Sequence, residues 1–147
     1  MAASAIALLL LCALALPTAA GVKEDILALT GNVHAKVVWT EGGTSIKGFD
    51  TQTGAEHTVT SGLSKAGRPF VTRDGARVVY STGGAVSGIH DFSSLHKVHI
   101  VDWDGGNART LSANGYLSSL WTDPAGSEWA IAMRSDCKTF VKIPLDG

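Results

Sequence analysis

The sequence predicts an all-β fold made of repeated four-stranded antiparallel units, and three observations lead to this prediction. After residue 21 the chain is a series of short runs rich in β-branched and aromatic residues. Turn signals separate these runs, and 17 of the 147 residues are glycine. The order of runs and turns then recurs along the chain. Apolar residues make up 45% of the sequence, which is the composition of a folded protein.

The clearest unit covers residues 66–113. Its predicted strands are 70–72, 77–81, 97–103 and 108–112. Asp74-Gly75 is the first turn, because glycine adopts the positive φ that a tight hairpin requires. Residues 104–107, Asp-Gly-Gly-Asn, form the last turn. The unit is therefore predicted to be one antiparallel meander.

An earlier unit covers residues 31–62, with predicted strands at 35–40, 45–50 and 57–60. Its Val-Val-Trp at 37–39 resembles Val-Val-Tyr 41 residues later, whereas its last two strands match the second unit at an offset of 52 residues. The difference of 11 residues predicts that 83–95 is an inserted loop. Residues 26–30, which precede this unit, fit either a strand or one helical turn.

A third unit covers residues 116–147. Its segment 120–126 resembles 69–75 at an offset of 51 residues, and strands are predicted at 129–133 and from 139 onward. The sequence stops where a fourth strand is due. We therefore expect an N-terminal fragment of a longer protein. The alternatives are repeats that self-associate into a ring and a decayed gene.

Units of about 40 to 50 residues with four strands each are the signature of β-propeller blades. Stacked blades bury aromatic and β-branched side chains between them. The sequence thus predicts a partial β-propeller, about two and a half blades within residues 21–147. Five aromatic residues are predicted to pack between blades, with sugar stacking as the alternative role: Trp39, Tyr80, Trp103, Trp121 and Trp129.

Residues 73–80, Arg-Asp-Gly-Ala-Arg-Val-Val-Tyr, resemble the S-P-D-G-x-x-I-x-F signature of TolB-type, WD40-like (PD40) propeller repeats. Residues 100–112 resemble the I-x-x-x-D-x-D-G-G-x-x-x-x-L-T segment that follows it. Thr72-Arg73 stands where the family has Ser-Pro. The resemblance covers residues 35–147. It implies an exported propeller, often of six or seven blades, and it implies no single function.

Residues 1–20 have the pattern of a signal peptide. An uncharged apolar run at 5–16 is followed by Pro17 and by small residues up to Ala20, where we expect cleavage. The run is short for a membrane span, although an uncleaved anchor is the alternative reading. We therefore expect export to the periplasm or the extracellular space, with no membrane span in the mature chain. Cleavage removes Cys12 and leaves Cys137 as the only cysteine, either buried or available for an intermolecular bond.

Composition and spacing point to no catalytic, cofactor-binding or metal-binding site. A net charge of −1 argues against nucleic acid as a partner. No Gly-x-Ser-x-Gly elbow marks a nucleophile. Acidic residues at turns are interpreted as caps of their own hairpins, not calcium ligands: Asp102, Asp104 and Asp146. Four residues in or beside the inserted loop could hold a metal but are interpreted as solvated loop and strand-edge residues: His90, Asp91, His96 and His99.

Two functions fit these observations. The first is an exported, non-catalytic propeller that binds a protein or a glycan, its ring closed by further blades of the same gene or by self-association. The second is the propeller portion of an exported enzyme, a polysaccharide lyase or a prolyl-oligopeptidase-like hydrolase. In that case the catalytic residues would lie outside this sequence.

Overall fold

The computed structural model describes residues 21–31, 33–83, 96–134, 136 and 138–146. Three antiparallel sheets are formed in these ranges, and in each the strands follow chain order. The first sheet contains β1 (Lys36–Glu41), β2 (Ser45–Asp50) and β3 (Ala55–Thr60). The second contains β4 (Phe70–Val71), β5 (Arg77–Thr82), β6 (Lys97–Asp102) and β7 (Arg109–Ser112). The third contains β8 (Tyr116–Thr122), β9 (Glu128–Met133) and β10 (Phe140–Pro144).

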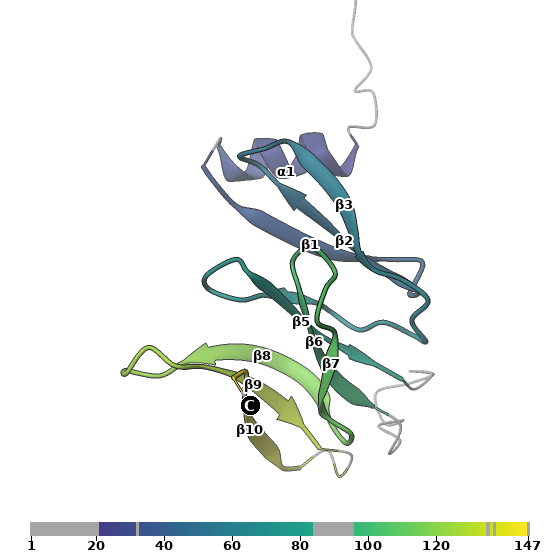
Figure 1. The fold of residues 1–147 in the computed structure, drawn as a ribbon, viewed down its shortest axis with the longest axis vertical. Coiled ribbons are helices and arrows are strands. Elements are labelled where there is room, and N and C mark those ends of the chain that lie inside the picture. Colours follow the sequence, from purple (N-terminus) through teal and green to yellow (C-terminus); the bar gives the residue numbers. More distant parts are fainter. Residues whose placement is uncertain (1–20, 32, 84–95, 135, 137, 147) are drawn as a thin grey trace, which may run out of the picture.

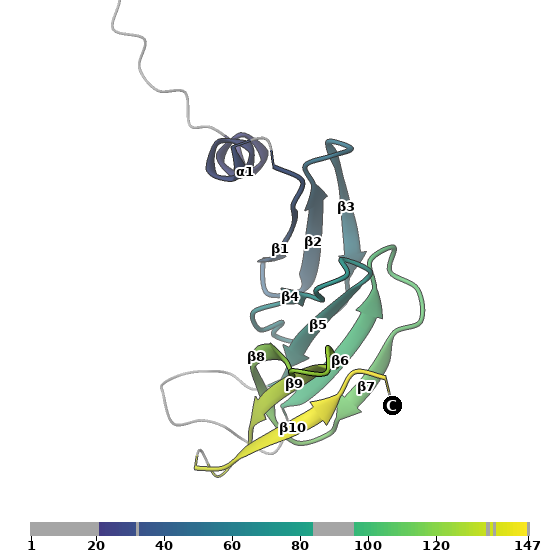
Figure 2. The same ribbon diagram turned by 90° about the vertical axis from the view of Figure 1, so that its left-hand side faces the viewer.

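The sheets are stacked in sequence order, with the second between the other two (Figures 1 and 2). Each is a meander, and the strands lie where the sequence predicts them. The predicted all-β class and partial propeller architecture are therefore confirmed. By correspondence with the second sheet, the first lacks a counterpart of β4 and the third lacks a counterpart of β7 within the described residues.

The interface between the first and second sheets is apolar. Its buried residues are Ile46, Val59, Val78, Tyr80 and Val101. Trp103 packs against this cluster, as the sequence predicted for Trp103 and Tyr80. Lys36 of β1 adds a polar link, since its Nζ donates to the Gly75 carbonyl oxygen at 2.8 Å and lies 4.7 Å from the centroid of the Trp103 ring.

A second buried cluster joins the second and third sheets. It contains Val79, Val98, Ile100, Leu117, Ala130, Ala132 and Leu145. The neighbours Val78 and Val79 of β5 thus enter opposite cores, because successive side chains of a strand point to opposite faces. A buried hydrogen bond crosses the same interface, from the Leu117 amide to the Ser81 hydroxyl oxygen at 2.7 Å.

The side chains of β9 alternate one residue out of step with the 51-residue offset of the repeat. An offset of 51 residues aligns Trp129 with Val78, which faces the preceding sheet, but in the structure Ala130 and Ala132 face it instead. The cause is the preceding hairpin. In the hairpin between β8 and β9, the Asp123 amide donates a hydrogen bond to the Ser127 carbonyl. In the hairpin between β4 and β5, the Thr72 amide donates to the Arg77 carbonyl, so that turn is one residue longer. A slip of one residue exchanges the two faces of a strand.

Two of the five predicted packing residues have no second sheet to pack against in the described chain. Trp121 and Trp129 do not pack between two sheets of the described chain. They lie on the face of the third sheet that points away from the second, and Trp121 is 44% exposed. Trp39 is partly buried on β1, on the face opposite Val38, which packs into the first interface. Only Tyr80 and Trp103 lie in the inter-sheet core.

Residues 22–30 form a helix, α1 (Val22–Thr30), which settles the alternatives left open for 26–30. The helix lies beside the first sheet, on the side away from the second (Figure 1). Ile26 is buried, and Lys23 Nζ lies 3.3 Å from Glu56 Oε2 of β3. Gly31 ends the helix with a φ of 57°, which glycine adopts at little cost.

In the described residues no helix is long and apolar enough to cross a bilayer. The proposed signal peptide, the loop 84–95 and Cys137 lie outside those residues, so they remain predictions.

We predict that Gly48→Ala destabilises the first interface. A Cβ at Gly48 would lie 2.9 Å from the tip of the Trp103 ring and 3.1 Å from a Val59 methyl group. We expect the free energy of unfolding to fall by about 1–3 kcal/mol because of this overpacking. That cost exceeds the stabilisation that alanine normally gives over glycine in a strand. Chemical denaturation followed by circular dichroism measures it.

The matched control is Gly48→Ala in a Trp103→Leu background, where the clash with the ring is absent. A double-mutant cycle should then show a smaller cost of the alanine. Equal costs in the two backgrounds would contradict the proposed contact.

Candidate binding site

The outward face of the third sheet presents an aromatic cluster. Trp121 of β8 and Trp129 of β9 are directly paired across the two strands. Lys142 of β10 covers them, with its Nζ 3.6 Å from the centroid of the Trp129 ring and 4.5 Å from that of Trp121. Phe140, 59% exposed, lies two residues before Lys142 on the same strand face. We call these four residues the aromatic face.

Two interactions fix the geometry of this face. The Trp129 Nε1–H donates to Asp123 Oδ2 at 3.0 Å, which orients the indole ring. Lys142 is attracted to both rings by a cation–π interaction, worth about 0.5–1 kcal/mol at an exposed site. Its ammonium group therefore rests on the rings with its other donors available to a ligand.

Sequence reasoning missed this face, although a signal was present. From Trp129 to Met133, large residues alternate with Ala130 and Ala132. In β9 the two alanines face the second sheet, and the larger residues that alternate with them lie on the outward face. The alternation was visible, but the assumed repeat offset hid it.

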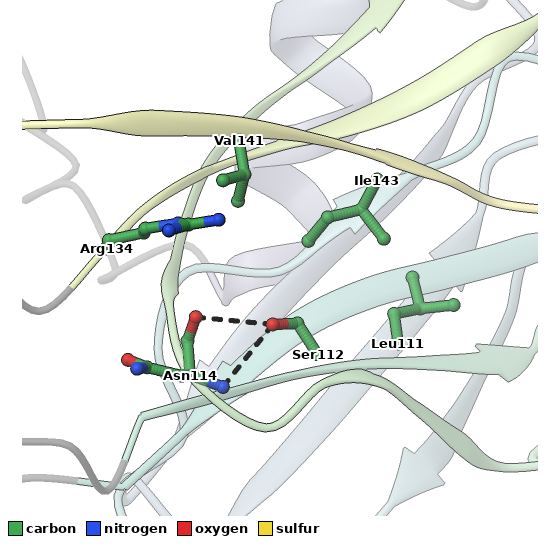
Figure 3. Close-up of a pocket in the computed structure, with 6 residues that line it drawn as sticks. All are labelled: Leu111, Ser112, Asn114, Arg134, Val141 and Ile143. Carbon is green, nitrogen blue, oxygen red and sulfur yellow. Dashed lines mark hydrogen bonds between the residues drawn. The ribbon is translucent and has the colours of Figure 1, made fainter.

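A cleft of about 450 Å³ lies beside the third sheet, between β7 and β10 (Figure 3). It is lined by Leu111, Ser112, Asn114, Arg134, Val141 and Ile143. The apolar lining residues come from β7 and β10, and Arg134 and Asn114 lie at the opposite end of the cleft (Figure 3). The cleft therefore has an apolar end and a polar end. Ser112 Oγ and the backbone of Asn114 bond to each other and fix the lower wall.

Arg134 follows β9 at the polar end of the cleft. Its backbone amide donates to the Thr139 carbonyl oxygen at 2.9 Å. No ion pair or hydrogen bond joins its guanidinium to another residue of the described ranges. Arg134 is exposed, and two further cations follow it in the sequence, Lys138 and Lys142.

No salt bridge joins Asp136 to Arg134 in the described ranges, although the charge of Arg134 contributes to lowering the Asp136 pKa. The Asp136 oxygens are held by their own turn. They accept from the Thr139 hydroxyl and from the amides of Lys138 and Thr139. The hydroxyl contributes most, the two amides add to it, and together they lower the pKa of Asp136 to about 2 from an ordinary value of 3.8.

The four residues considered as metal ligands do not form one site in the described chain. His90 and Asp91 lie outside the described residues. His99 has both ring nitrogens near hydroxyls, Nε2 at 2.7 Å from Thr82 Oγ1 and Nδ1 at 3.2 Å from Thr110 Oγ1. Burial, and secondly the charge of Lys97, lowers the pKa of His99.

His96 is buried and packs edge-on against Tyr116, with ring centroids 5.6 Å apart. It is therefore not a solvated residue, which corrects the sequence interpretation. In the ranges that the structure describes, no three His, Cys, Asp or Glu residues converge as metal ligands would.

Asp104 follows the expected pattern of bonding a backbone amide of its own hairpin, whereas Asp102 bonds a side-chain amide and Asp146 pairs with another sheet. Asp104 Oδ1 accepts from the Gly106 amide at 2.9 Å, and Asp102 Oδ2 accepts from Asn107 Nδ2 at 2.6 Å. Asp146 pairs with Arg77 Nη1 of the second sheet at 2.7 Å. Both Arg77 and Arg109 also donate to the Leu145 carbonyl oxygen, so the end of the third sheet is attached to the second.

We predict that the Asp136 carboxyl titrates near pH 2, and that Thr139→Val raises this pKa toward 3.8. The native pKa is below the unfolded value. Its contribution to stability is therefore present above pH 4 and is lost as the pH falls through 2. Carboxyl ¹³C NMR titration measures the pKa. Lys138→Ala is the control, since it keeps the backbone donor and should leave the pKa near 2; a similar rise in both variants would contradict the assignment to the hydroxyl.

No protein-family model matches the chain, and no curated protein matches it. Among solved structures, the crystal structure of TolB from Acinetobacter baumannii is similar to 74% of this chain, with a TM-score of 0.43 and 19% sequence identity. The chain spans 29% of the length of that structure. TolB is a β-propeller, but the assignment of this chain to blade-like units rests on its own sheets.

Proposed function

We propose that this chain is an exported, non-catalytic binding module of the propeller type whose third sheet docks another protein. The observation that carries the proposal is the aromatic face. Trp121 and Phe140 are exposed on the outward face of the third sheet, and a lysine lies over two tryptophans. Tryptophans and other rigid aromatic residues dominate the binding energy of protein interfaces.

The position of Lys142 favours a protein over a glycan. A sugar ring stacks on an open indole face, but here an ammonium group lies 3.6 Å from the Trp129 centroid and 4.5 Å from that of Trp121. A sugar would have to displace it and lose the cation–π interaction. A protein partner can keep it, by placing a carboxylate or a carbonyl oxygen on the ammonium and apolar groups on Trp121 and Phe140.

Export and the domain boundaries are part of the same proposal. Residues 1–20 have the charge-free apolar run and small residues of a signal peptide. Residues 21–147 then form one unit, with blade-like parts at 31–62, 66–113 and 116–147. In this arrangement the aromatic face becomes available to partners in the periplasm or the extracellular space.

Site-specific photo-crosslinking in the native host tests this function. A benzoylphenylalanine in place of Trp121 should capture one protein species, identified by mass spectrometry. The same group in place of Gln52, an exposed turn residue of the first sheet, is the control and should not capture it. Adding Lys142→Glu to the Trp121 probe should reduce the yield severalfold, because the charge on the aromatic face is reversed.

Two results would overturn the proposal. Equal capture from both positions would show that the aromatic face is not a specific site. Turnover of a peptide or pectin substrate by the purified full chain would show an enzyme instead of a binding module.

A further inference from the structure

We infer that a cleft between the first and second sheets is a binding site for a small organic acid, with Arg73 as the residue that holds its carboxylate. The inference goes beyond the proposed function, because this cleft lies at a different inter-sheet boundary and uses none of the aromatic face. Both walls come from within the continuous described stretch 33–83.

The cleft has a volume of about 500 Å³, within the range of sites that hold small molecules. Residues 34–36, at the start of β1, form one wall. Residues 71–75, from the end of β4 and the turn after it, form the other. The lining combines apolar residues and charged ones: Ala35 and Val71, and His34, Lys36, Arg73 and Asp74.

Arg73 combines a fixed backbone with a guanidinium that has no partner in the described chain. Its amide donates to both carboxylate oxygens of Glu128 on β9, at 3.0 and 3.1 Å, which holds the turn in place. Its guanidinium forms no ion pair or hydrogen bond with another residue of the described ranges. Such a planar group is suited to bidentate binding of a carboxylate.

The two cations of the opposite wall interact with groups of the protein. His34 Nε2 lies 3.3 Å from Asp50 Oδ1, and Lys36 bonds to the turn carbonyl described above. Burial opposes the charge of Asp50, but the backbone amide two residues later and the charges of His34 and Lys36 lower its pKa. Arg73 is not among the groups that compensate this carboxylate.

Asp74, the carboxylate in the cleft wall, is compensated by its own turn. Its Oδ1 accepts from the Thr72 hydroxyl at 2.6 Å and from the Ala76 amide at 2.9 Å. These bonds lower the pKa of Asp74, with a smaller contribution from the charge of Arg77. Arg73 is therefore the cation that a ligand can bind without displacing a contact of the protein.

The turn favours a carboxylate over a phosphate. Phosphate sites in turns are built from successive free backbone N–H groups. Here the amides of residues 73, 75, 76 and 77 already donate to protein acceptors on Glu128, Thr72 and Asp74. A single guanidinium beside apolar lining instead matches a planar carboxylate on a short hydrocarbon chain.

Succinate is the probe, and succinamide, its uncharged isostere, is the control ligand. Binding to the full chain is measured by ¹H–¹⁵N NMR titration at constant ionic strength. Succinate should cause saturable shifts of the Gly75 amide and of the Arg73 Nε–H, with a Kd of about 1 mM or lower. Succinamide should cause no saturable shift, because it offers no charge to the guanidinium.

Arg73→Gln removes the guanidinium but keeps the backbone amide that bonds to Glu128. We expect succinate to bind at least about tenfold more weakly, the scale of a lost hydrogen bond to a charged group. Arg73→Lys keeps the charge without the planar fork and should give an intermediate affinity. Arg68→Gln removes an exposed cation outside the cleft and is the matched control, with unchanged affinity. Circular dichroism checks that all three variants are folded.

The inference is overturned if succinate causes no saturable shift at about 10 mM, above the millimolar range expected. It is also overturned if succinamide binds equally well, if Arg68→Gln weakens binding as much as Arg73→Gln, or if inorganic phosphate binds more tightly than succinate at the same residues. None of these results affects the proposed function, whose crosslinking test uses position 121. Loss of specific crosslinking with intact succinate binding would overturn the proposed function alone.

Discussion

The alternation of side chains along β5 is the constraint on which the rest of this structure depends. Val78 and Val79 are both fully buried, but in different cores. A sheet that is apolar on both faces cannot stand in water by itself, so the second sheet requires a neighbour on each side. The first and third sheets supply those neighbours, and each is left with one face that no other sheet of the described chain covers.

The two outer faces are treated differently. On the first sheet, the helix α1 lies over the outer side, with Ile26 buried and Lys23 paired to Glu56. On the third sheet, the only covering group among the described residues is the side chain of Lys142, lying on two tryptophans. This asymmetry is why the binding function is assigned to the third sheet and not to the first.

The strands of the central unit were predictable because local chemistry determines them. Gly75 and Gly105 have φ values of 71° and 91°, so the glycines that marked the turns in the sequence are required there. The aromatic face was not predictable in the same way, because the direction of Trp129 depends on whether the preceding hairpin closes over five residues, as at 123–127, or over six, as at 72–77. The helix was predicted only as one alternative for residues 26–30, since Gly21 supplies no side-chain cap and the packing partner of the helix is distant in sequence.

The short hairpin between Asp123 and Ser127 has a consequence for how such a surface can evolve. Point substitutions in this turn change single side chains, whereas gain of one codon would shift β9 relative to β8 and turn Trp129 toward the space that Ala130 now fills. A change in turn length alone can therefore change which side chains a blade presents on its outward face, with the strand sequences unchanged.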